Sequence, residues 1–302
     1  MPAEGLEYVP RSDLLTYEEI ERLAEIAVGR LGVDAIRLTG GEPTVRADLA
    51  ELVRRLARLR TWDGAPVDLS LTTNGTTLRR QAEPLRAAGL GRVNISLDSL
   101  RPERFAAITR RDALDKVLDG IDAALEVGFS PVKVNVVVVR GLNDDELIDF
   151  AAFGRERGVQ PRFIEFMPLD ADGTWTMDQV VSSDEIVASI GAVYPLEEVP
   201  HGPEPASRLR YADGKGEIGV IASVTKPFCA DCDRVRMTAE GQFRTCLFST
   251  DEIDLRRPLR NGASDDELID LLAQAVGDKW AGHRIGQVNF IRPKRSMSQI
   301  GG

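Results

Sequence analysis

Apolar and polar positions alternate in blocks along the first 170 residues of the 302-residue chain. Short apolar runs, rich in β-branched residues and ending in Gly, Asn, Asp or Pro, are separated by stretches of mixed character. Such runs are typical of strands that are buried on both faces of a parallel sheet. The pattern therefore predicts five β-strands, over residues 35–41, 67–75, 92–99, 132–141 and 161–169.

The stretches between these strands carry apolar residues at spacings of three and four, the period of an α-helix. This spacing predicts helices over 49–59 and 114–125, and Thr16 with Glu19 forms the capping-box pattern that opens an earlier helix. We expect a further helix to begin at Asn143 as its N-cap. Strands and helices in alternation predict parallel βαβ units, and hence an α/β barrel or an open parallel sheet.

The chain begins with an irregular segment and a helix, whereas a parallel barrel is expected to begin with a strand. We therefore expect a first strand to be absent from this sequence. After residue 170 the pattern changes, because residues 216–224 and 234–248 predict antiparallel strands, the second a hairpin that turns at Gly241. The sequence predicts two domains, a partial barrel over 1–170 and a C-terminal α+β domain over 171–302.

The composition is that of a soluble globular protein, with 43% hydrophobic and 28% charged residues. The sequence holds no apolar run of membrane-spanning length and no secretory signal at its start, so we expect a cytoplasmic protein without a membrane partner. A net charge of −10 argues against non-specific nucleic-acid binding, which needs a broadly basic surface.

Three cysteines are present, and all lie in the pattern Cys229-x2-Cys232-x13-Cys246. An odd, clustered set is not a disulfide framework. The hairpin can bring the third sulfur beside the first two, which leaves three interpretations. These are three unrelated buried cysteines, a zinc site with a distant fourth ligand such as His201 or His283, and an iron–sulfur cluster held by three thiolates with one iron open.

Basic residues surround these cysteines. Arg234 and Arg236 alternate along the strand and project to one face, and Arg244 returns opposite them. Guanidinium groups bind phosphate through paired hydrogen bonds, so an anionic ligand is one explanation and a solvated, ion-paired hairpin face is the other. Arg37 and Lys133 lie inside apolar strands, where a charge must be ion-paired or directed into a ligand cavity.

Polar and glycine residues follow the predicted strands. Ligands of parallel α/β folds bind at the carboxyl ends of the strands. Here these ends carry Gly40-Gly41-Glu42-Pro43, Thr72-Thr73-Asn74-Gly75, Ser96-x-Asp98-Ser99 and Met167-Pro168. They could provide close backbone approach and hydrogen bonds for an amino acid and a ribose, although each is also a commonplace turn.

Taken together, these motifs identify a known family. The segments IRLTGGEPTVRADL, LTTNG, NISLDSL, VKVNVVVVRGLND, RFIEFMPL and FCADCDRVRMTAEGQFRTCLF, with the terminal Gly-Gly, resemble the GTP 3′,8-cyclases, radical S-adenosylmethionine enzymes of molybdenum cofactor biosynthesis. The resemblance runs essentially end to end. The cysteine pattern with Arg-x-Arg and the Gly-Gly tail is specific to this family, whereas the GGEP turn indicates only the superfamily.

The resemblance implies a fold and a reaction. The fold is a (β/α)6-type, TIM-like barrel, here missing its first strand, with a C-terminal α+β domain that carries an iron–sulfur cluster. In the reaction a 5′-deoxyadenosyl radical abstracts hydrogen from C3′ of the GTP ribose, and C3′ then bonds to purine C8. The implied product is (8S)-3′,8-cyclo-7,8-dihydroguanosine 5′-triphosphate, on which cyclic pyranopterin monophosphate synthase acts next, and a homodimer is possible.

The resemblance also implies roles for individual residues. A C-terminal [4Fe-4S] cluster, whose open iron takes the purine, would be held by Cys229, Cys232 and Cys246. GTP would be bound by Arg37, Thr72, Lys133, Arg234 and Arg236. S-adenosylmethionine would contact Gly41, Ser96 and Met167. The tail, Gly301 and Gly302, would reach the active site.

One departure from the family concerns the radical-generating cluster. The family carries it on a CxxxCxxC loop that directly precedes a Met-Pro like Met1-Pro2, and this sequence contains no such loop. We therefore expect the chain as given not to cleave S-adenosylmethionine, and a second cluster only in a longer chain. Two other functions stay open: a non-catalytic remnant that binds nucleotide or a partner, and a zinc-dependent α/β enzyme.

Overall fold

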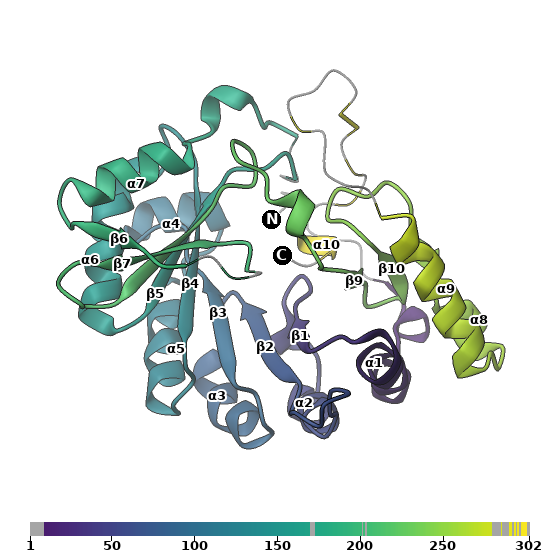
Figure 1. Cartoon of the computed structure of the whole chain (residues 1–302). Helices are drawn as coiled ribbons and strands as arrows, with labels where there is room; N and C mark the ends of the chain where they lie inside the picture. Colours follow the sequence, from purple (N-terminus) through teal and green to yellow (C-terminus); the bar gives the residue numbers. More distant parts are fainter. Residues whose placement is uncertain are drawn as a thin grey trace.

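The computed structural model describes residues 9–169, 173–200, 202, 204–279, 285, 290, 291, 293, 295 and 297–300. One curved sheet dominates it (Figure 1). Five parallel strands come first, and all five predicted strands are confirmed. In spatial order the sheet contains β1 (Ala35–Leu38), β2 (Asp68–Thr73), β3 (Arg92–Ser96), β4 (Val132–Val138), β5 (Gln160–Glu165), β8 (Glu217–Ile221), β7 (Ser207–Tyr211) and β6 (Leu196–Glu198).

Helices cover the outer face of this sheet (Figure 1). They are α1 (Tyr17–Leu31), α2 (Leu49–Leu56), α3 (Leu78–Ala87), α4 (Pro102–Thr109), α5 (Leu114–Glu126), α6 (Leu147–Arg157) and α7 (Ser183–Gly191). Thr16 and Glu19 form the predicted capping box of α1. The predicted parallel α/β class is confirmed. None of the described helices is long and apolar enough to cross a membrane.

Side chains alternate between the two faces of each strand, as the pleat requires. On the outer face Leu71, Ile95 and Phe163 are fully buried and belong to the main hydrophobic core. The residues between them along the strands are polar, and several are nearly buried as well: Ser70, Asn94, Lys133 and Arg162. The fold therefore places a polar and cationic surface on the concave side, opposite to the helices.

The sheet continues past the predicted domain boundary at residue 170. The predicted strand over 216–224 is β8, which pairs antiparallel with β7 as expected but also parallel with β5. It therefore extends the barrel sheet, and it is not confined to a separate antiparallel unit. A boundary between residues 170 and 171 stays a prediction.

A second, smaller unit with its own hydrophobic core forms around the cysteine hairpin. It contains β9 (Arg236–Met237), β10 (Gln242–Arg244), β11 (Ile253–Asp254), α8 (Arg256–Arg260) and α9 (Asp265–Gly277), followed by α10 (Met297–Ile300). The predicted hairpin is confirmed, because β9 and β10 pair antiparallel around Gly241, which adopts a φ of +82°. Leu23 and Ile26 of α1 pack here with Leu268 of α9, so α1 joins this unit to the barrel (Figure 1).

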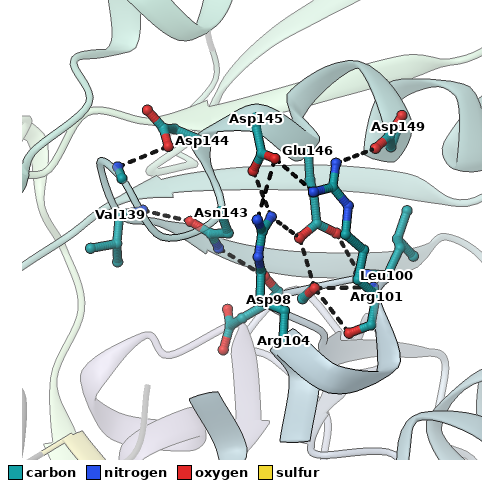
Figure 2. A network of polar contacts seen from close by, with 12 residues as sticks. Asp98, Leu100, Arg101, Arg104, Val139, Asn143, Asp144, Asp145, Glu146 and Asp149 are labelled. Carbon is teal, nitrogen blue, oxygen red and sulfur yellow. Dashed lines mark hydrogen bonds and ion pairs between the residues drawn. The ribbon is translucent and has the colours of Figure 1, made fainter. Parts of the chain in front are cut away.

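The side chains of Asn143 and Glu146 hold the loops after β3 and β4 together (Figure 2). Asn143 is the N-cap residue of the short 3-10 helix η3 (Asp144–Glu146), as predicted, but its side chain makes no capping hydrogen bond. Its amide instead donates to the carbonyls of Asp98 (2.7 Å) and Val137 (2.8 Å). The carboxylate of Glu146, fully buried, accepts from Ser99 Oγ and Leu100 N, both at 2.7 Å. The strand ends are thereby fixed.

Close packing of α5 against the turn after β2 generates a stability prediction. A Cβ built on Gly120 would lie 2.4 Å from the carbonyl oxygen of Gly75, which is backbone and cannot rotate away. We expect Gly120→Ala to lower the free energy of unfolding by about 1–3 kcal/mol. Gly29→Ala in α1, where a Cβ meets nothing within 4 Å, should instead raise it by up to about 1 kcal/mol. Urea unfolding measures both, and equal effects would contradict this packing.

Candidate functional site

Cationic side chains from distant parts of the chain gather on the concave face. Arg37 lies on β1, Lys133 on β4 and Arg162 on β5, while Arg234 and Arg236 come from the cysteine hairpin. The charges of Arg162 and Arg234 both act on Arg37, and the charge of Arg37 acts on Arg236. The structure thus brings four of the predicted GTP-binding cations together, and adds one that sequence reasoning missed.

Glu204 lies among these cations. Its Oε2 accepts from Arg162 Nη2 at 2.7 Å and lies 3.4 Å from Lys133 Nζ. Burial alone would raise the pKa of Glu204, but the charges of Lys133 and Arg162 outweigh it and hold this pKa below its usual value. Within the described residues, Lys133 and Arg162 have no other carboxylate partner. One carboxylate between two buried cations leaves a net positive charge.

The electrostatics favour an anionic ligand. Desolvation and the charges of neighbouring arginines together lower the pKa of Arg37 to about 10, although its side chain remains accessible to water. Desolvation and the charge of Arg234 lower the pKa of Arg236 to about 10. Desolvation and the charge of Arg162 lower the pKa of Lys133 to about 8. Each shift means that the charged form is disfavoured until a negative charge arrives.

The strand register aligns Thr72 with Lys133. Thr72 pairs with Asn94, and Asn94 pairs with Lys133, so the three residues form one row across β2, β3 and β4. Asn94 Nδ2 lies 3.4 Å from Thr72 Oγ1. Because residues in register point to the same face, the hydroxyl and the ammonium group face the same concave surface. A polar substrate can therefore contact both.

The carboxylate of Glu42 holds the turn after β1, which contains Gly40 and Gly41. Glu42 accepts from Thr44 N (3.0 Å), Thr73 Oγ1 (2.7 Å) and Asn74 N (2.6 Å), which ties this turn to the end of β2. Gly40 has a φ of +145°, and Gly41 is exposed. The backbone at Gly41 is consequently open to close approach by a ligand.

Ser96 and Met167 lie at the same edge of the sheet as Gly41. Ser96 ends β3 and is exposed, and Met167 follows β5 by two residues. Asn135 of β4 is in register with Ser96, and its buried Oδ1 has no hydrogen-bond partner in the part of the chain described. Burial raises the pKa of the nearby Asp98 to about 6. These strand ends therefore offer both exposed and unsatisfied polar groups.

The three cysteines lie in an electropositive environment. Arg234 Nη2 is 3.5 Å and Lys279 Nζ is 3.9 Å from Cys232 Sγ. Burial alone would raise the pKa of Cys232, but the backbone N–H and the charge of Arg234 lower it. The charges of Cys246 and Cys232 both act on Arg236, so these two sulfurs share one guanidinium neighbour. The surroundings of Cys232 therefore favour its thiolate, the form that binds metal.

Three cysteines are a donor set that fits an iron–sulfur cluster with one open iron. Among the described residues, no group of three or more His, Cys, Asp or Glu side chains is close enough to hold one metal ion. A cubane cluster spaces its thiolates more widely, because each one binds a different iron. Both histidines considered as a fourth zinc ligand, His201 and His283, lie outside the described residues.

Arg244 does not join the cationic site. Its side chain is buried, forms an ion pair with Glu252 and donates to the carbonyls of Leu247 and Ser249. Strand alternation placed it opposite Arg236, which is correct, since the two residues pair in register. Its guanidinium group, however, interacts with residues of the hairpin's own loop.

The described part of the C-terminal tail lies against the site. Arg295 pairs with Glu240 at 2.6 Å and with Glu252 at 2.7 Å, and Met297 N donates to the carbonyl of Leu169 at 3.3 Å. Leu169 lies two residues beyond Met167, and α10 lies on the concave side of the sheet (Figure 1). The predicted tail residues Gly301 and Gly302 lie outside the described residues.

Comparison with known proteins decides the family. Two family descriptions match, "Radical SAM superfamily" over residues 4–154 and "Molybdenum Cofactor Synthesis C" over residues 159–285. A protein of Rhodopirellula baltica named GTP 3′,8-cyclase is 48% identical over 307 residues, which is 100% of this chain and 84% of that protein. The chain belongs to the GTP 3′,8-cyclase family. The Streptomyces coelicolor GTP 3′,8-cyclase is also 48% identical, over 100% of this chain and 88% of its own length.

A solved structure of HydG, a maturase of the [FeFe]-hydrogenase, superposes with a TM-score of 0.47 at 17% identity, over 63% of this chain and 46% of that one. The sequence matches confirm the family resemblance inferred from the motifs. The roles assigned to individual residues stay predictions for this member of the GTP 3′,8-cyclase family.

Lys133 generates a prediction about pH. Its pKa of about 8 in the free protein means that it is charged at pH 7 and largely neutral at pH 9. A bound anion raises this pKa. The affinity for the anion is therefore highest below pH 8, where Lys133 is charged, and it falls as the pH rises through 8. We expect the Kd for GTP to rise about tenfold between pH 7 and pH 9.

The matched control is Lys133→Arg, which stays charged over the same range. Any titration of GTP itself affects both proteins equally, so the difference between them isolates Lys133. Isothermal titration calorimetry at constant ionic strength measures both. An identical pH dependence in the two proteins would show that Lys133 does not contact the anion.

Proposed function

We propose that this chain is a GTP 3′,8-cyclase, whose reaction converts GTP to (8S)-3′,8-cyclo-7,8-dihydroguanosine 5′-triphosphate in molybdenum cofactor biosynthesis, and that these 302 residues bind the substrate but do not turn it over by themselves. The observation that carries this proposal is the electrostatic link between Arg37 of the barrel and Arg234 and Arg236 of the cysteine hairpin. A ligand that neutralises Arg37 as well as Arg234 and Arg236 must extend from the concave face to the cysteine hairpin. A nucleoside triphosphate has an anionic end and a base far enough apart to do so.

The chain's own residues bind and orient this substrate. Lys133 and Arg37, with Arg162, attract the triphosphate, and Thr72 offers a hydroxyl in the same row as Lys133. Displacement of Glu204 by the triphosphate would exchange one carboxylate for several phosphate charges, which favours binding. Arg234 and Arg236 join the phosphate end to the hairpin, and the purine then lies toward the cysteines.

Cys229, Cys232 and Cys246 would hold a [4Fe-4S] cluster with one iron left open. When bound, this cluster supplies a Lewis-acidic iron to the purine. Lys279 donates to the carbonyls of Cys232 and Arg234, so it holds the loop that carries the ligands. The backbone N–H and the charge of Arg234 lower the pKa of Cys232 and so favour its thiolate, the form that binds metal.

S-adenosylmethionine would bind at the strand ends, where Gly41 offers backbone, Ser96 a hydroxyl and Met167 an apolar contact. Asn135 has an unsatisfied oxygen beside Ser96 that could accept from a ribose hydroxyl. This arrangement sets the adenosyl group on the same concave face as the nucleotide. Transfer of the product to cyclic pyranopterin monophosphate synthase, and a homodimer, stay predictions.

The cysteine count generates a prediction about cluster content. All three cysteines of this sequence lie in 229–246, so a polypeptide of these 302 residues can hold about one [4Fe-4S] cluster. After reconstitution with iron and sulfide we expect about one cluster per chain, binding of GTP and no release of 5′-deoxyadenosine. Iron and sulfide analysis, with chromatography of the nucleoside products, measures these quantities. About two clusters per chain, or turnover, would contradict the proposal that the radical-generating cysteines lie outside this sequence.

A fusion separates the cyclase from its alternatives. The N-terminal segment of the Streptomyces coelicolor relative, joined ahead of this chain, is expected to restore 5′-deoxyadenosine release and cyclised product. A fusion that holds both clusters and binds GTP without turnover would support the binding-only alternative. Zinc in the freshly purified chain, retained without iron, would support the zinc-dependent enzyme.

A further inference from the structure

Glu165, the last residue of β5, is a fully buried carboxylate with four hydrogen bonds. It accepts from the backbone N–H groups of Ser183 (2.8 Å), Val224 (2.7 Å) and Thr225 (2.8 Å), and from the hydroxyl of Thr225. All four donors are neutral. Hydrogen bonds of this kind to a charged acceptor are stronger than neutral ones, and they compensate for burying the charge.

These four bonds join three segments at one point. Glu165 precedes Met167 by two residues, Ser183 begins α7, and Thr225 precedes Cys229 by four residues. The backbone that leads into the cysteine loop is therefore fastened to the strand end proposed to contact S-adenosylmethionine.

Lys226 and Phe228, which lie between Thr225 and Cys229, also make contacts. Lys226 Nζ pairs with Asp184 at 2.6 Å, but both side chains are well exposed, and such pairs contribute little. The guanidinium of Arg234 lies over the ring of Phe228, 5.0 Å from its centroid, which is a contact within the cysteine loop itself. The Glu165 carboxylate is a buried attachment of this segment to the barrel.

We propose that Glu165 is a positioning residue, which sets the placement of the Cys229–Cys232 loop relative to the strand-borne cations and thereby the reach of one nucleotide across both. This inference rests on the proposed function. Glu165 touches neither reactant nor cysteine. It acts through the backbone of Val224 and Thr225.

The chain offers a matched control. Glu146 is also fully buried and also accepts from a backbone N–H and a serine hydroxyl, but it pairs in addition with Arg104 at 2.6 Å and ties the loops after β3 and β4 (Figure 2). In either residue, replacement by Gln exchanges one acceptor oxygen for an NH₂ group and leaves buried donors without an acceptor. Glu146→Gln also removes the charge that pairs with Arg104, so the control imposes at least as much chemical damage as Glu165→Gln, at a different place.

The first measurement is GTP binding to the cluster-loaded chain by titration calorimetry, with thermal unfolding recorded for each variant. We expect Glu165→Gln to weaken GTP binding about tenfold, since one or two unsatisfied donors loosen the loop. Glu146→Gln should lower the Tm comparably and leave the Kd for GTP within about twofold. Equal losses of affinity in both variants, or none in Glu165→Gln, would overturn the proposal.

The second measurement does not depend on GTP. Hydrogen–deuterium exchange of peptides that cover 222–233 should be faster in Glu165→Gln than in the wild-type chain, and unchanged there in Glu146→Gln. If the wild-type chain does not bind GTP, the proposed function fails, whereas exchange still decides the role of Glu165. Unchanged exchange in both variants would refute it.

A milder pair covers the case in which Glu165→Gln does not fold. Thr225→Val removes only the hydroxyl donor to Glu165, and Thr225→Ser keeps it. We expect faster exchange over 222–233 and weaker GTP binding in Thr225→Val, and wild-type behaviour in Thr225→Ser. Identical behaviour of the two variants would count against the proposed role of Glu165.

Discussion

Repulsion among buried like charges is the constraint on which the concave face depends. Lys133 and Arg162 are nearly buried on adjacent strands, and one carboxylate, Glu204, lies between them. Arg37 and the hairpin arginines extend the same positive surface, and desolvation lowers the pKa values of Arg37, Lys133 and Arg236. Such an arrangement is unfavourable alone and becomes favourable when a polyanion enters, so the face is built for its substrate.

Two buried carboxylates and one half-buried carboxylate hold the loops around this face. Glu42, Glu146 and Glu165 each lie beside the carboxyl end of a strand, and each accepts from backbone N–H groups of a neighbouring loop. The three carboxylates join β1 to β2, β3 to β4, and β5 to the segment after β8. Loops that must present glycine backbone, hydroxyls and thiolates to ligands are thereby held by the sheet. Charge-assisted bonds to backbone groups contribute to the placement of these loops, together with buried apolar residues such as Leu97 and Val224.

The sequence predicted the strands, the parallel class and most of the cationic site, because these depend on patterns that alternation and composition carry directly. Arg37 and Lys133 were found because a charge inside an apolar strand has a high cost. Arg162 obeys the same rule within β5 and was overlooked. Glu204 gave no signal, since it lies in an irregular segment and finds its cations only through the fold. Arg244 shows the reverse limit: alternation predicts the face of a side chain but not its partner. Asn143 and Glu165 bind backbone groups, whose positions leave no trace in side-chain patterns.

The central claim is that the barrel cations and the cysteine loop form one site with two ends, and affinity for two ligands tests it most directly. GTP and inorganic triphosphate would be titrated into the chain with and without its reconstituted cluster. The claim predicts that the cluster strengthens GTP binding at least about tenfold and changes triphosphate binding by less than about threefold, because only GTP reaches the cysteines. An equal effect of the cluster on both ligands, or no effect on GTP, would contradict it.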